Sequence, residues 1–437
     1  MQYDVIIIGT GFGSLTAAAL LCKRGFKVCL LEQAKYPGGC ATSYKRKGYW
    51  FETGATTLVG LDEGMPLWYL LEETGIRIPG LRKLEIPMQV HLPDGTVATR
   101  YQHLEAWIAE AERVFGKYNQ RPFWEYCYNI SRQVWWVSLQ QQSFPFSTFG
   151  DVWQGIRSFR PEQLRLLPGA FRTVADLLKH YSLDKNQLFT DFVNEQLLIT
   201  AQNHMGEVNA LFGATALCYT LYSNYYIDGG LINLVNPVLD YCRQQGAIVK
   251  YGHQVNSIKP IDEKYCVSTS KGHFTGSYLI SGIPLNNTLD LYQDAKLQHK
   301  LQHSILPSEK LNGAFTMSLV LKKQEHQPVL HHQLHVPEGL PVIGSKSFFV
   351  SFSHPADTMR APAGEQVASI STHIPDPSKT YISRKDALAQ TIVDKLHQEG
   401  LVNKADMLSY QSATPGAWQF WTKRSFGAVG GYPQYSH

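Results

Sequence analysis

Cysteine is scarce in this sequence, and charge of neither sign predominates. The 437 residues include 7 cysteines, an odd number without a C-x-x-C pair, which argues against a disulfide framework and against a zinc site. The 40 lysines and arginines are balanced by 36 aspartates and glutamates, so the net charge is only +4. The one short basic run, Lys45 to Lys47, is too small for a nucleic-acid-binding stripe. We therefore expect reduced core cysteines, no metal and no nucleic-acid partner.

Long apolar runs are also missing, and the first strand pattern begins at the third residue. A helix that crosses a bilayer needs about 20 consecutive apolar residues, so no transmembrane segment is expected. A strand that starts this early leaves no room for a signal or transit peptide, which predicts a cytoplasmic protein. The aromatic content of 12% is high, as expected for a large apolar pocket or a surface that contacts membrane. The sequence does not set the oligomeric state.

The strongest signal is the stretch YDVIIIGTGFGSLTAAALLCKRGFKVCLLEQ at residues 3–33. Val5 to Ile8 form a continuous apolar run, which is typical of a parallel strand covered on both faces. Gly9 and Gly11 follow at once and allow a tight turn, so that a pyrophosphate can approach the N-terminus of a helix expected at residues 14–24. The stretch therefore predicts a dinucleotide-binding βαβ unit of Rossmann type.

Two further positions refine this prediction. Glu32 ends the second strand about twenty residues beyond the glycines, where a carboxylate accepts hydrogen bonds from an adenosine ribose and repels a 2′-phosphate. This position favours FAD or NAD over NADP. Ser14 stands where a third glycine is usual, and its CH2OH group is a small addition between helix and strand. We expect the serine to be tolerated at a cost of about 1 kcal/mol.

A second glycine turn follows in the stretch YPGGCATSYKRKGYWFETGAT at residues 36–56. Gly38 and Gly39 can pass close to a phosphate or a flavin, and residues 49–54 are typical of a strand that ends at Glu52. The Glu52 side chain either contacts the flavin or only terminates the strand. We favour the structural role.

The alternation of strands and helices stops near residue 63 and returns near residue 225. We therefore predict an α/β fold, in which a Rossmann-like FAD-binding domain is interleaved with an α+β substrate domain. The predicted parts are the first part of the FAD-binding domain, a helical cap rich in aromatic residues, the second part of the FAD-binding domain, and the sheet and helices of the substrate domain, at residues 1–62, 63–224, 225–290 and 291–437.

Nearly the whole chain resembles one known family, the FAD-dependent carotenoid desaturases, carotenoid isomerases and retinol saturases, which are phytoene dehydrogenase-related flavoproteins. Its opening motifs are similar to three segments here, VIIIGTGFGSLTAA, LLEQAKYPGGCATSY and YWFETGAT. Later segments follow in the family's order, namely FVNEQLLITAQ (192–202), YYIDGGLINLVNPV (225–238), FSHPADTMRAPAGEQVASISTH (352–373) and ATPGAWQFWTKRSFGAVGGYPQ (413–434). The resemblance implies a flavoprotein with two dinucleotide-binding motifs that acts on a long apolar polyene.

The same resemblance implies the residues that contact FAD. They surround the pyrophosphate, the adenosine ribose, the ribityl chain and the adenine, and they are Gly9, Gly11, Gly13, Ser14, Glu32, Gly38, Gly39, Glu52 and Val255. Val255 would contribute backbone contacts to adenine, or would be only a core strand residue. Family members continue past the GAVGGYPQ region with a Gly-Asp turn and a helix. We therefore expect the segment that closes the flavin pocket to be absent, so that either the chain is truncated or the protein binds FAD weakly.

Other polar residues carry weaker signals. Glu195 and His204 lie near the middle of the predicted cap and could protonate or orient a substrate, but both are also typical of ordinary satisfied polar residues. Asp228 precedes two glycines, which favours a surface turn. His331 and His335 are four residues apart, a metal-ligand spacing only on a helix, and their surroundings favour strand or loop. Catalytic residues stay unassigned, because flavin chemistry leaves most of the reaction to the cofactor.

The sequence thus predicts an FAD-dependent oxidoreductase that desaturates, saturates or isomerises a carotenoid or retinoid. Two alternatives stay open: an amine-oxidase-like flavoprotein, and a non-catalytic prenyl- or lipid-binding protein of the same fold, as in the Rab escort and GDP-dissociation-inhibitor proteins. Because polyenes dissolve in membranes, we also expect peripheral membrane contact. The expected contact is the aromatic stretch at residues 136–160, with Phe144, Phe146, Phe149, Arg157 and Arg160.

Overall fold

The computed structural model describes residues 2–140, 153, 167–292, 294–324, 327–379 and 384–435. Most of the stretch expected to contact membrane lies outside these residues, including all five side chains predicted for it: Phe144, Phe146, Phe149, Arg157 and Arg160. Among the helices of the described ranges, none combines the length and the apolar character that crossing a bilayer requires.

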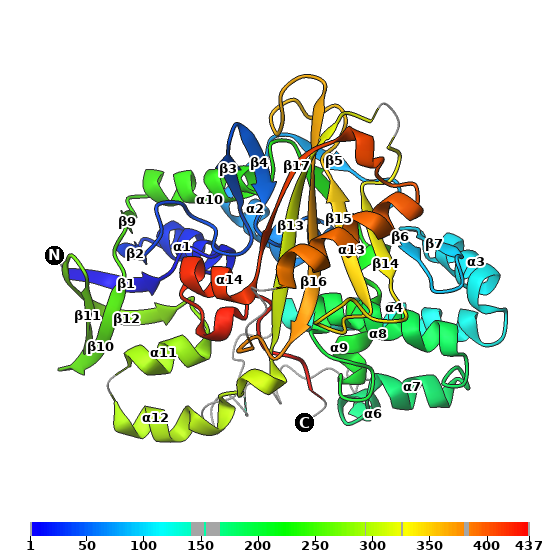
Figure 1. Ribbon diagram of the computed structural model, residues 1–437. Helices are drawn as coiled ribbons and strands as arrows, with labels where there is room; N and C mark the ends of the chain where they lie inside the picture. The colour runs from blue at the N-terminus through cyan, green and yellow to red at the C-terminus, as the bar shows by residue number, and fades with distance from the viewer. Residues whose placement is uncertain are drawn as a thin grey trace.

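Two large sheets organise the molecule (Figure 1). The first has six strands in the order β10-β11-β12-β1-β2-β9. Their bounds are Gln2–Ile8 for β1, Val28–Glu32 for β2, Ile248–Tyr251 for β9, Val255–Ile261 for β10, Lys264–Thr269 for β11 and Gly272–Ser281 for β12. β1 pairs in parallel with β2 and with β12, so the N-terminal segment and the segment after residue 225 share one sheet. This arrangement confirms the predicted Rossmann-like α/β fold.

Both faces of β1 are buried, as its unbroken apolar run predicts. Val5 and Ile7 belong to a core shared with α1 (Phe12–Lys23) and α10 (Ile232–Gln244), whereas Ile6 lies in a second core with β10 and β11. The helix expected at residues 14–24 thus begins two residues earlier, directly after the glycine turn. This packing fixes the carboxyl ends of β1 and β2 beside the start of α1, where parallel sheets bind their ligands.

The second sheet has seven strands in the order β17-β13-β16-β15-β14-β6-β7. Their bounds are Met88–His91 for β6, Val97–Arg100 for β7, Asn312–Lys322 for β13, His331–His335 for β14, Ser347–Phe352 for β15, Glu365–Pro375 for β16 and Met407–Ala413 for β17. One face packs on α13 (Lys385–Gln398) through side chains such as Phe315, Leu319 and Ile392. The helix predicted near residues 384–399 is therefore present.

Residues 81–100 differ from the helical pattern expected between residues 63 and 224. β6 pairs in parallel with β14, so a strand from the predicted cap extends the sheet of the C-terminal part. The reason is local: Met88, Val90 and Ala98 present a buried apolar face to the helices that follow. Strands β6 and β7 thus interrupt a segment expected to be mainly helical, and the predicted division into domains stays a prediction.

The helices between residues 104 and 221 enclose the aromatic core of the cap. Trp107, Trp124 and Phe192 are fully buried, and the guanidinium of Arg100 lies 4.1 Å from the Trp107 ring centroid. Arg100 is buried and hydrogen-bonded, since its Nη2 donates to the Leu217 carbonyl at 2.6 Å. Much of the aromatic content of this segment is thus ordinary core packing.

The remaining elements are short. Two small sheets pair β3 (Ser43–Arg46) with β4 (Tyr49–Glu52) and β5 (Leu81–Lys83) with β8 (Tyr225–Ile227). The other helices are α2 (Pro66–Thr74), α3 (Leu104–Phe115), α4 (Gln120–Gln140), α6 (Leu167–Ala170), α7 (Val174–His180), α8 (Gln187–Ala201), α9 (Ala210–Leu217), α11 (Leu285–Leu291), α12 (Ala295–Leu301) and α14 (Pro415–Thr422). The 3-10 turns are η2 (Tyr219–Leu221), η3 (Gln302–Ser304), η4 (Ser308–Lys310), η6 (Lys404–Asp406) and η7 (Ser425–Gly427).

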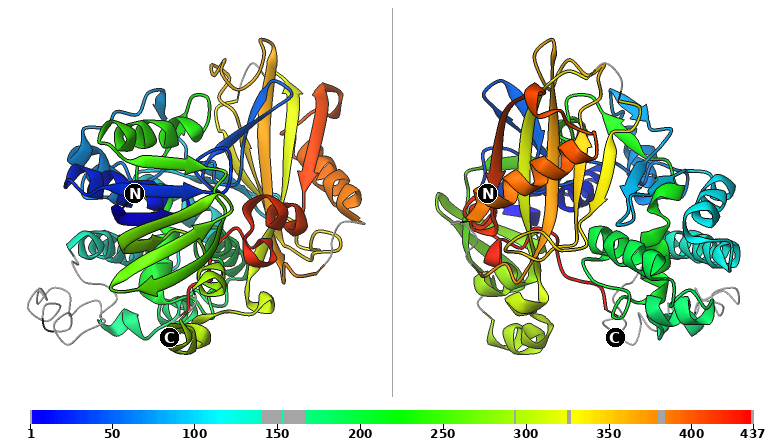
Figure 2. Two further views of the ribbon diagram at one scale, coloured as in Figure 1. Left: turned by 90° about the vertical axis from the view of Figure 1, so that its left-hand side faces the viewer. Right: turned by 45° about the vertical axis from the view of Figure 1, so that its right-hand side comes forward.

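The β3-β4 hairpin links the two large sheets. It begins in the Rossmann-like half and reaches the seven-stranded sheet (Figure 2). There Phe51 packs in one buried cluster with Val320 and Val367. The strand predicted to end at Glu52 is β4, so this prediction is confirmed.

Candidate functional site

A cavity of about 840 Å³ lies between the glycine turns and the seven-stranded sheet. This volume falls in the range of ordinary ligand pockets, roughly 300–1,000 Å³. Six of the nine residues predicted to bind FAD line it, namely Gly9, Gly11, Glu32, Gly39, Glu52 and Val255. Gly13, Ser14 and Gly38 do not line it.

The two predicted glycine turns lie side by side. The Gly38 N–H donates to the Thr10 carbonyl at 2.9 Å, and Gly11 and Gly38 form a β-bridge. Gly38 has φ +103°, and a Cβ built there would lie 2.6 Å from the Thr42 Cβ, so no other residue fits without rearrangement. Although Gly38 does not line the cavity, it holds the second turn against the first. Two turns separated in sequence thereby form one backbone wall.

Glu32 is buried and is held by the first turn. Its Oε2 accepts hydrogen bonds from the Thr10 N–H at 2.9 Å and the Thr10 hydroxyl at 2.6 Å, while Oε1 accepts from the Ala34 N–H at 2.8 Å. The carboxylate therefore has a fixed orientation on the cavity wall. Oε1 accepts only one of these bonds and keeps acceptor capacity for a ribose hydroxyl.

The Ser14 side chain lies against Gly282, at the end of the neighbouring strand β12. Its hydroxyl is buried without a hydrogen-bond partner among the described residues, and a Cβ on Gly282 would overlap it. Gly282 comes directly after β12, and its N–H donates to the Ile8 carbonyl at 2.9 Å. The motif has serine instead of glycine at position 14, and the missing side chain of Gly282 leaves the room that this serine needs.

Glu52 joins three segments of the chain. Its carboxylate accepts from the Ser43 hydroxyl at 2.7 Å and from the Leu231 N–H at 3.3 Å, and it forms a buried ion pair with Arg360 at 3.2 Å. Burial raises the pKa of Glu52, and the Arg360 charge opposes this shift. The side chain also borders the cavity. These contacts favour the predicted structural role, and its role in cofactor binding stays a prediction.

The cavity wall formed by the seven-stranded sheet is rich in hydroxyl groups. Along β13, Phe315 belongs to the core on α13, whereas Thr316 and Ser318 line the cavity. Met317 belongs to this core and also borders the cavity. The Tyr44 hydroxyl lies 3.1 Å from the Ser318 hydroxyl and accepts from the Gln411 amide at 3.0 Å. The sequence reasoning did not find this wall, because single hydroxyls in strands carry no signal of their own.

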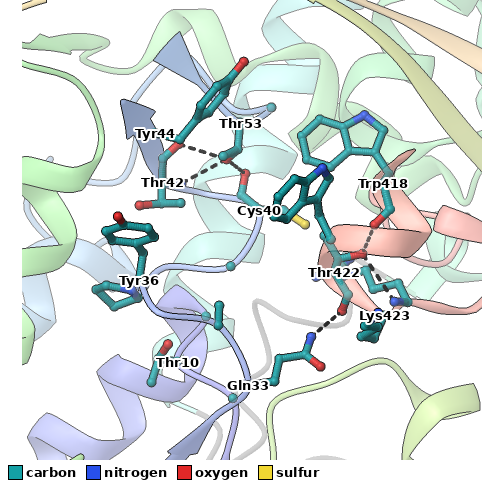
Figure 3. Close-up of a pocket in the computed structure, with 18 of the residues that line it drawn as sticks. Thr10, Gln33, Tyr36, Cys40, Thr42, Tyr44, Thr53, Trp418, Thr422 and Lys423 are labelled. Atoms are coloured by element: carbon teal, nitrogen blue, oxygen red, sulfur yellow. Dashed lines mark hydrogen bonds between the residues drawn. The ribbon is translucent and has the colours of Figure 1, made fainter. Parts of the chain in front are cut away.

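A third wall comes from α14 and the residues after it. In Figure 3, Thr10, Cys40 and Thr53 lie across from Trp418, and the Gln33 amide donates to the Thr422 carbonyl at 2.7 Å. This segment also contributes Trp421, Lys423 and Arg424 to the cavity lining.

Arg424 lies close to the second glycine turn. Burial raises the pKa of the Cys40 thiol, and the Arg424 charge opposes this rise. The sequence comparison singled out residues 413–434 as family-like, but nothing in the pattern showed that they face the glycine turns.

The weaker candidates lie elsewhere. The Glu195 carboxylate accepts from the Ser347 hydroxyl at 2.6 Å, and burial raises its pKa. Burial lowers the pKa of His204. Neither residue lines the cavity, which favours the reading of satisfied polar residues. Asp228 lies in a turn, where Arg82 contacts both of its carboxylate oxygens at 2.7 Å.

His331 and His335 lie on a strand, as the pattern around them predicted. β14 is a strand of the seven-stranded sheet, and all five of its residues are buried. Within the residues that the structure describes, no group of three or more His, Cys, Asp or Glu side chains could hold a metal ion.

Comparisons with known proteins agree with this geometry. Residues 7–74 match the family of NAD(P)-binding Rossmann-like domains. Prolycopene isomerase of Arabidopsis thaliana is 23% identical over 99% of this chain and 75% of its own length, and 4,4′-diaponeurosporene oxygenase of Staphylococcus aureus is 21% identical over 94% and 84%. A variant of putrescine oxidase has the same fold, with a TM-score of 0.63 and 14% identity over 97% of this chain and 87% of that one.

The fold and the cavity define a Rossmann-type α/β protein in which the glycine turns face a second large sheet across one cavity. Over nearly its whole length the chain is similar to carotenoid-acting enzymes, an isomerase and an oxygenase, which confirms the resemblance that its motifs predicted.

Proposed function

We propose that this protein binds FAD and uses it to desaturate, saturate or isomerise a carotenoid or retinoid. One observation carries the proposal: a single cavity contains both glycine turns and Glu32 at one side and the wall of the seven-stranded sheet at the other. A dinucleotide on the glycine turns would therefore direct its ring toward the sheet. The relatives named above, an isomerase and an oxygenase, support a polyene as the substrate.

The residues on the first wall fit a dinucleotide. Gly9, Gly11 and Gly39 present no side chains to it, and α1 begins without a side-chain cap, which leaves the N–H groups of its first turn available to phosphate. Glu32 would accept hydrogen bonds from the adenosine ribose, with Val255 beside the adenine. Bound FAD would supply hydride transfer, while the chain's own residues hold the substrate and exclude water.

The amine-oxidase alternative has support from the fold alone, because the likeness to putrescine oxidase is structural.

Peripheral membrane contact is part of our proposal, and α14 offers a described surface for it. Phe420 and Trp421 are 63% and 72% exposed, and the Lys423 ammonium lies 4.7 Å from the Phe420 ring centroid. Aromatic side chains beside a cation suit the headgroup boundary of a membrane.

The absorption spectrum of the full-length protein tests the cofactor. Protein mixed with FAD and freed of unbound ligand should keep flavin bands at about 370 and 450 nm. Glu32→Ala should weaken FAD binding by about 1–3 kcal/mol, because a buried charge-assisted hydrogen bond is lost. Protein without flavin bands, or with a preference for NAD, would contradict the proposal. Binding of a prenyl lipid without flavin would support the non-catalytic alternative.

The substrate class has its own test. Flavin-loaded protein is incubated with carotenoid and retinoid isomers in vesicles, and the products are separated by chromatography. Conversion of a polyene supports the proposal, whereas oxidation of an amine under the same conditions would favour the amine-oxidase alternative.

Vesicle flotation of Phe420→Ser/Trp421→Ser protein examines membrane contact, with loss of flotation expected.

A further inference from the structure

Three side chains that are far apart in sequence form one line of hydrogen bonds that ends in the cavity. His331 on β14 lies directly opposite Ser351 on β15, and its Nδ1 is 2.7 Å from the Ser351 Oγ. The Ser351 hydroxyl in turn donates to the Thr56 Oγ1 at 2.7 Å. Thr56 follows β4 and lines the cavity, whereas His331 is fully buried behind the wall.

The direction of these bonds fixes where each hydrogen lies. Because Ser351 donates its hydrogen to Thr56, its oxygen accepts from His331, so the imidazole carries its hydrogen on Nδ1. Burial lowers the pKa of His331 to about 3, which keeps the ring neutral at physiological pH. The Nε2 atom is then an acceptor, and it has no partner among the described residues. Stacking against Phe349, at a centroid distance of 5.9 Å, holds the ring plane.

The Thr56 hydroxyl is the end of this line. Its oxygen accepts from Ser351, and its own hydrogen has no acceptor among the residues that the structure describes. Hydrogen bonds in a series polarise one another, so a hydroxyl that accepts one bond becomes a stronger donor of the next. A buried histidine and serine behind Thr56 thus prepare a donor that nothing in the described protein uses.

We propose that Thr56 donates this hydrogen to an acceptor atom of the ligand at the sheet side of the cavity, with Ser351 and His331 as positioning residues. The acceptor is a carbonyl oxygen or a ring nitrogen. Two ligands carry such atoms: the flavin ring, and a polyene with an oxygenated end group. This inference rests on the proposed function and adds a specific contact to it.

A purely structural role would link the loop after β4 to the sheet and would leave the ligand unaffected. The two roles differ in the spectrum and midpoint potential of bound flavin, because a donor to the ring stabilises the negative charge that the ring gains on reduction. They also differ in discrimination between a polyene with a terminal hydroxyl or carbonyl and its hydrocarbon analogue, since a lost partner penalises only the oxygenated ligand.

The experiment uses FAD-loaded, full-length protein with Thr56→Val, which keeps the shape of the side chain and removes the hydroxyl. If the ring accepts the bond, the visible flavin band shifts and the midpoint potential becomes more negative without substrate. If the substrate accepts it, the flavin is unchanged and the preference for the oxygenated polyene falls about tenfold in kcat/KM. Either result supports the proposal, and no change in either measurement overturns it.

Three further variants separate positioning from folding. Ser351→Ala should reproduce the Thr56→Val effect in part and should add nothing in the Thr56→Val background, because Ser351 acts through Thr56. Additive effects would overturn the positioning role. Ser131→Ala is the matched control, since it also removes a buried serine hydroxyl with a hydrogen-bond partner, the Tyr222 hydroxyl at 2.7 Å, but Ser131 does not line the cavity. Thr56→Ser keeps the hydroxyl and should restore the wild-type values. Wild-type protein that retains no flavin would instead count against the proposed function.

Discussion

The two main walls of the cavity are built in different ways. The Rossmann-like wall presents backbone atoms of two turns that lie within one short stretch of sequence, at residues 9–11 and 38–39. The sheet wall presents hydroxyl side chains from strands as distant as β13 and β17. Backbone recognition is therefore encoded locally, by glycines at fixed spacing, whereas side-chain recognition depends on which strands the topology brings together.

The walls also differ in how they treat charge. Glu32 on the first wall is held by two N–H groups and a hydroxyl, so its carboxylate is stabilised in place. The strand next to the second wall buries three histidines, and burial lowers their pKa values to about 3 for His331 and about 4 for His332 and His335. These rings are neutral in the folded protein. We therefore expect acid to destabilise the seven-stranded sheet, which forms the second wall, more than the Rossmann-like wall.

Acid gives the largest predicted effect on this comparison. Below the ordinary histidine pKa of 6.5, these histidines become protonated in the unfolded chain but stay neutral in the folded protein. Protonation favours the unfolded state, so the free energy of unfolding falls from about pH 6.5 down to about pH 4. At pH 5 each buried histidine costs about 2 kcal/mol relative to neutral pH, from about 1.4 kcal/mol per pKa unit. Three such costs approach the net stability of a typical domain, about 5–15 kcal/mol.

Denaturant unfolding at pH 7 and pH 5 measures this effect. His335→Leu removes one of the titrating rings, so the loss of stability between the two pH values should shrink by about 2 kcal/mol. Equal stability at both pH values would contradict the prediction.

The buried ion pair of Glu52 and Arg360, which connects the two walls, gives the next largest predicted effect. Arg360→Met leaves Glu52 buried without its charge partner, which should lower the free energy of unfolding by about 3–5 kcal/mol. Because burial raises the pKa of Glu52, uptake of a proton should recover part of this loss, so the effect is larger at pH 8 than at pH 6.

A surface ion pair is the matched control for this substitution. Lys23 and Glu73 are 42% and 36% exposed, so Lys23→Met should cost less than about 1 kcal/mol. Chemical denaturation of both variants compares them. Similar small losses would mean that the Glu52–Arg360 pair does not hold the walls together.

The same contrast explains which features could be predicted from the sequence. Glu32, Gly9, Gly11 and Gly39 were found because one βαβ unit and the turn after it place them on a common wall. The link from Ser351 to Thr56 joins residues 295 positions apart, and the parallel pairing of β6 with β14 is equally remote. No periodicity reports such pairings, because each depends on the packing of the whole chain.

Within the Rossmann-like wall, a smaller effect tests the replacement of the third glycine. Gly282→Ala places a methyl group against the Ser14 hydroxyl, and overpacking of this kind costs about 1–3 kcal/mol. Ser14→Gly should restore most of the stability in the double variant, because it removes the Ser14 atoms that the methyl group meets and leaves only the Ile8 carbonyl oxygen at 3.0 Å. Thermal unfolding of the two single variants and the double variant measures this coupling. Additive losses would show that the two positions do not share this space.

The smallest predicted effect concerns the third wall, which closes over the other two. Arg424 lines the cavity beside Cys40, next to the second glycine turn, which is expected to lie near the phosphates and the ribityl chain. Arg424→Gln therefore removes a positive charge that would face a doubly charged ligand. We expect FAD to bind about tenfold more weakly, and the salt dependence of its binding to fall. Riboflavin, which lacks the phosphates, should bind both proteins equally. Arg46→Gln is the matched control, because Arg46 lines the same cavity from β3 and is exposed to solvent. Fluorescence titration of flavin gives all six affinities, and an equal loss for FAD and riboflavin in Arg424→Gln would mean that Arg424 contributes to packing rather than to phosphate binding.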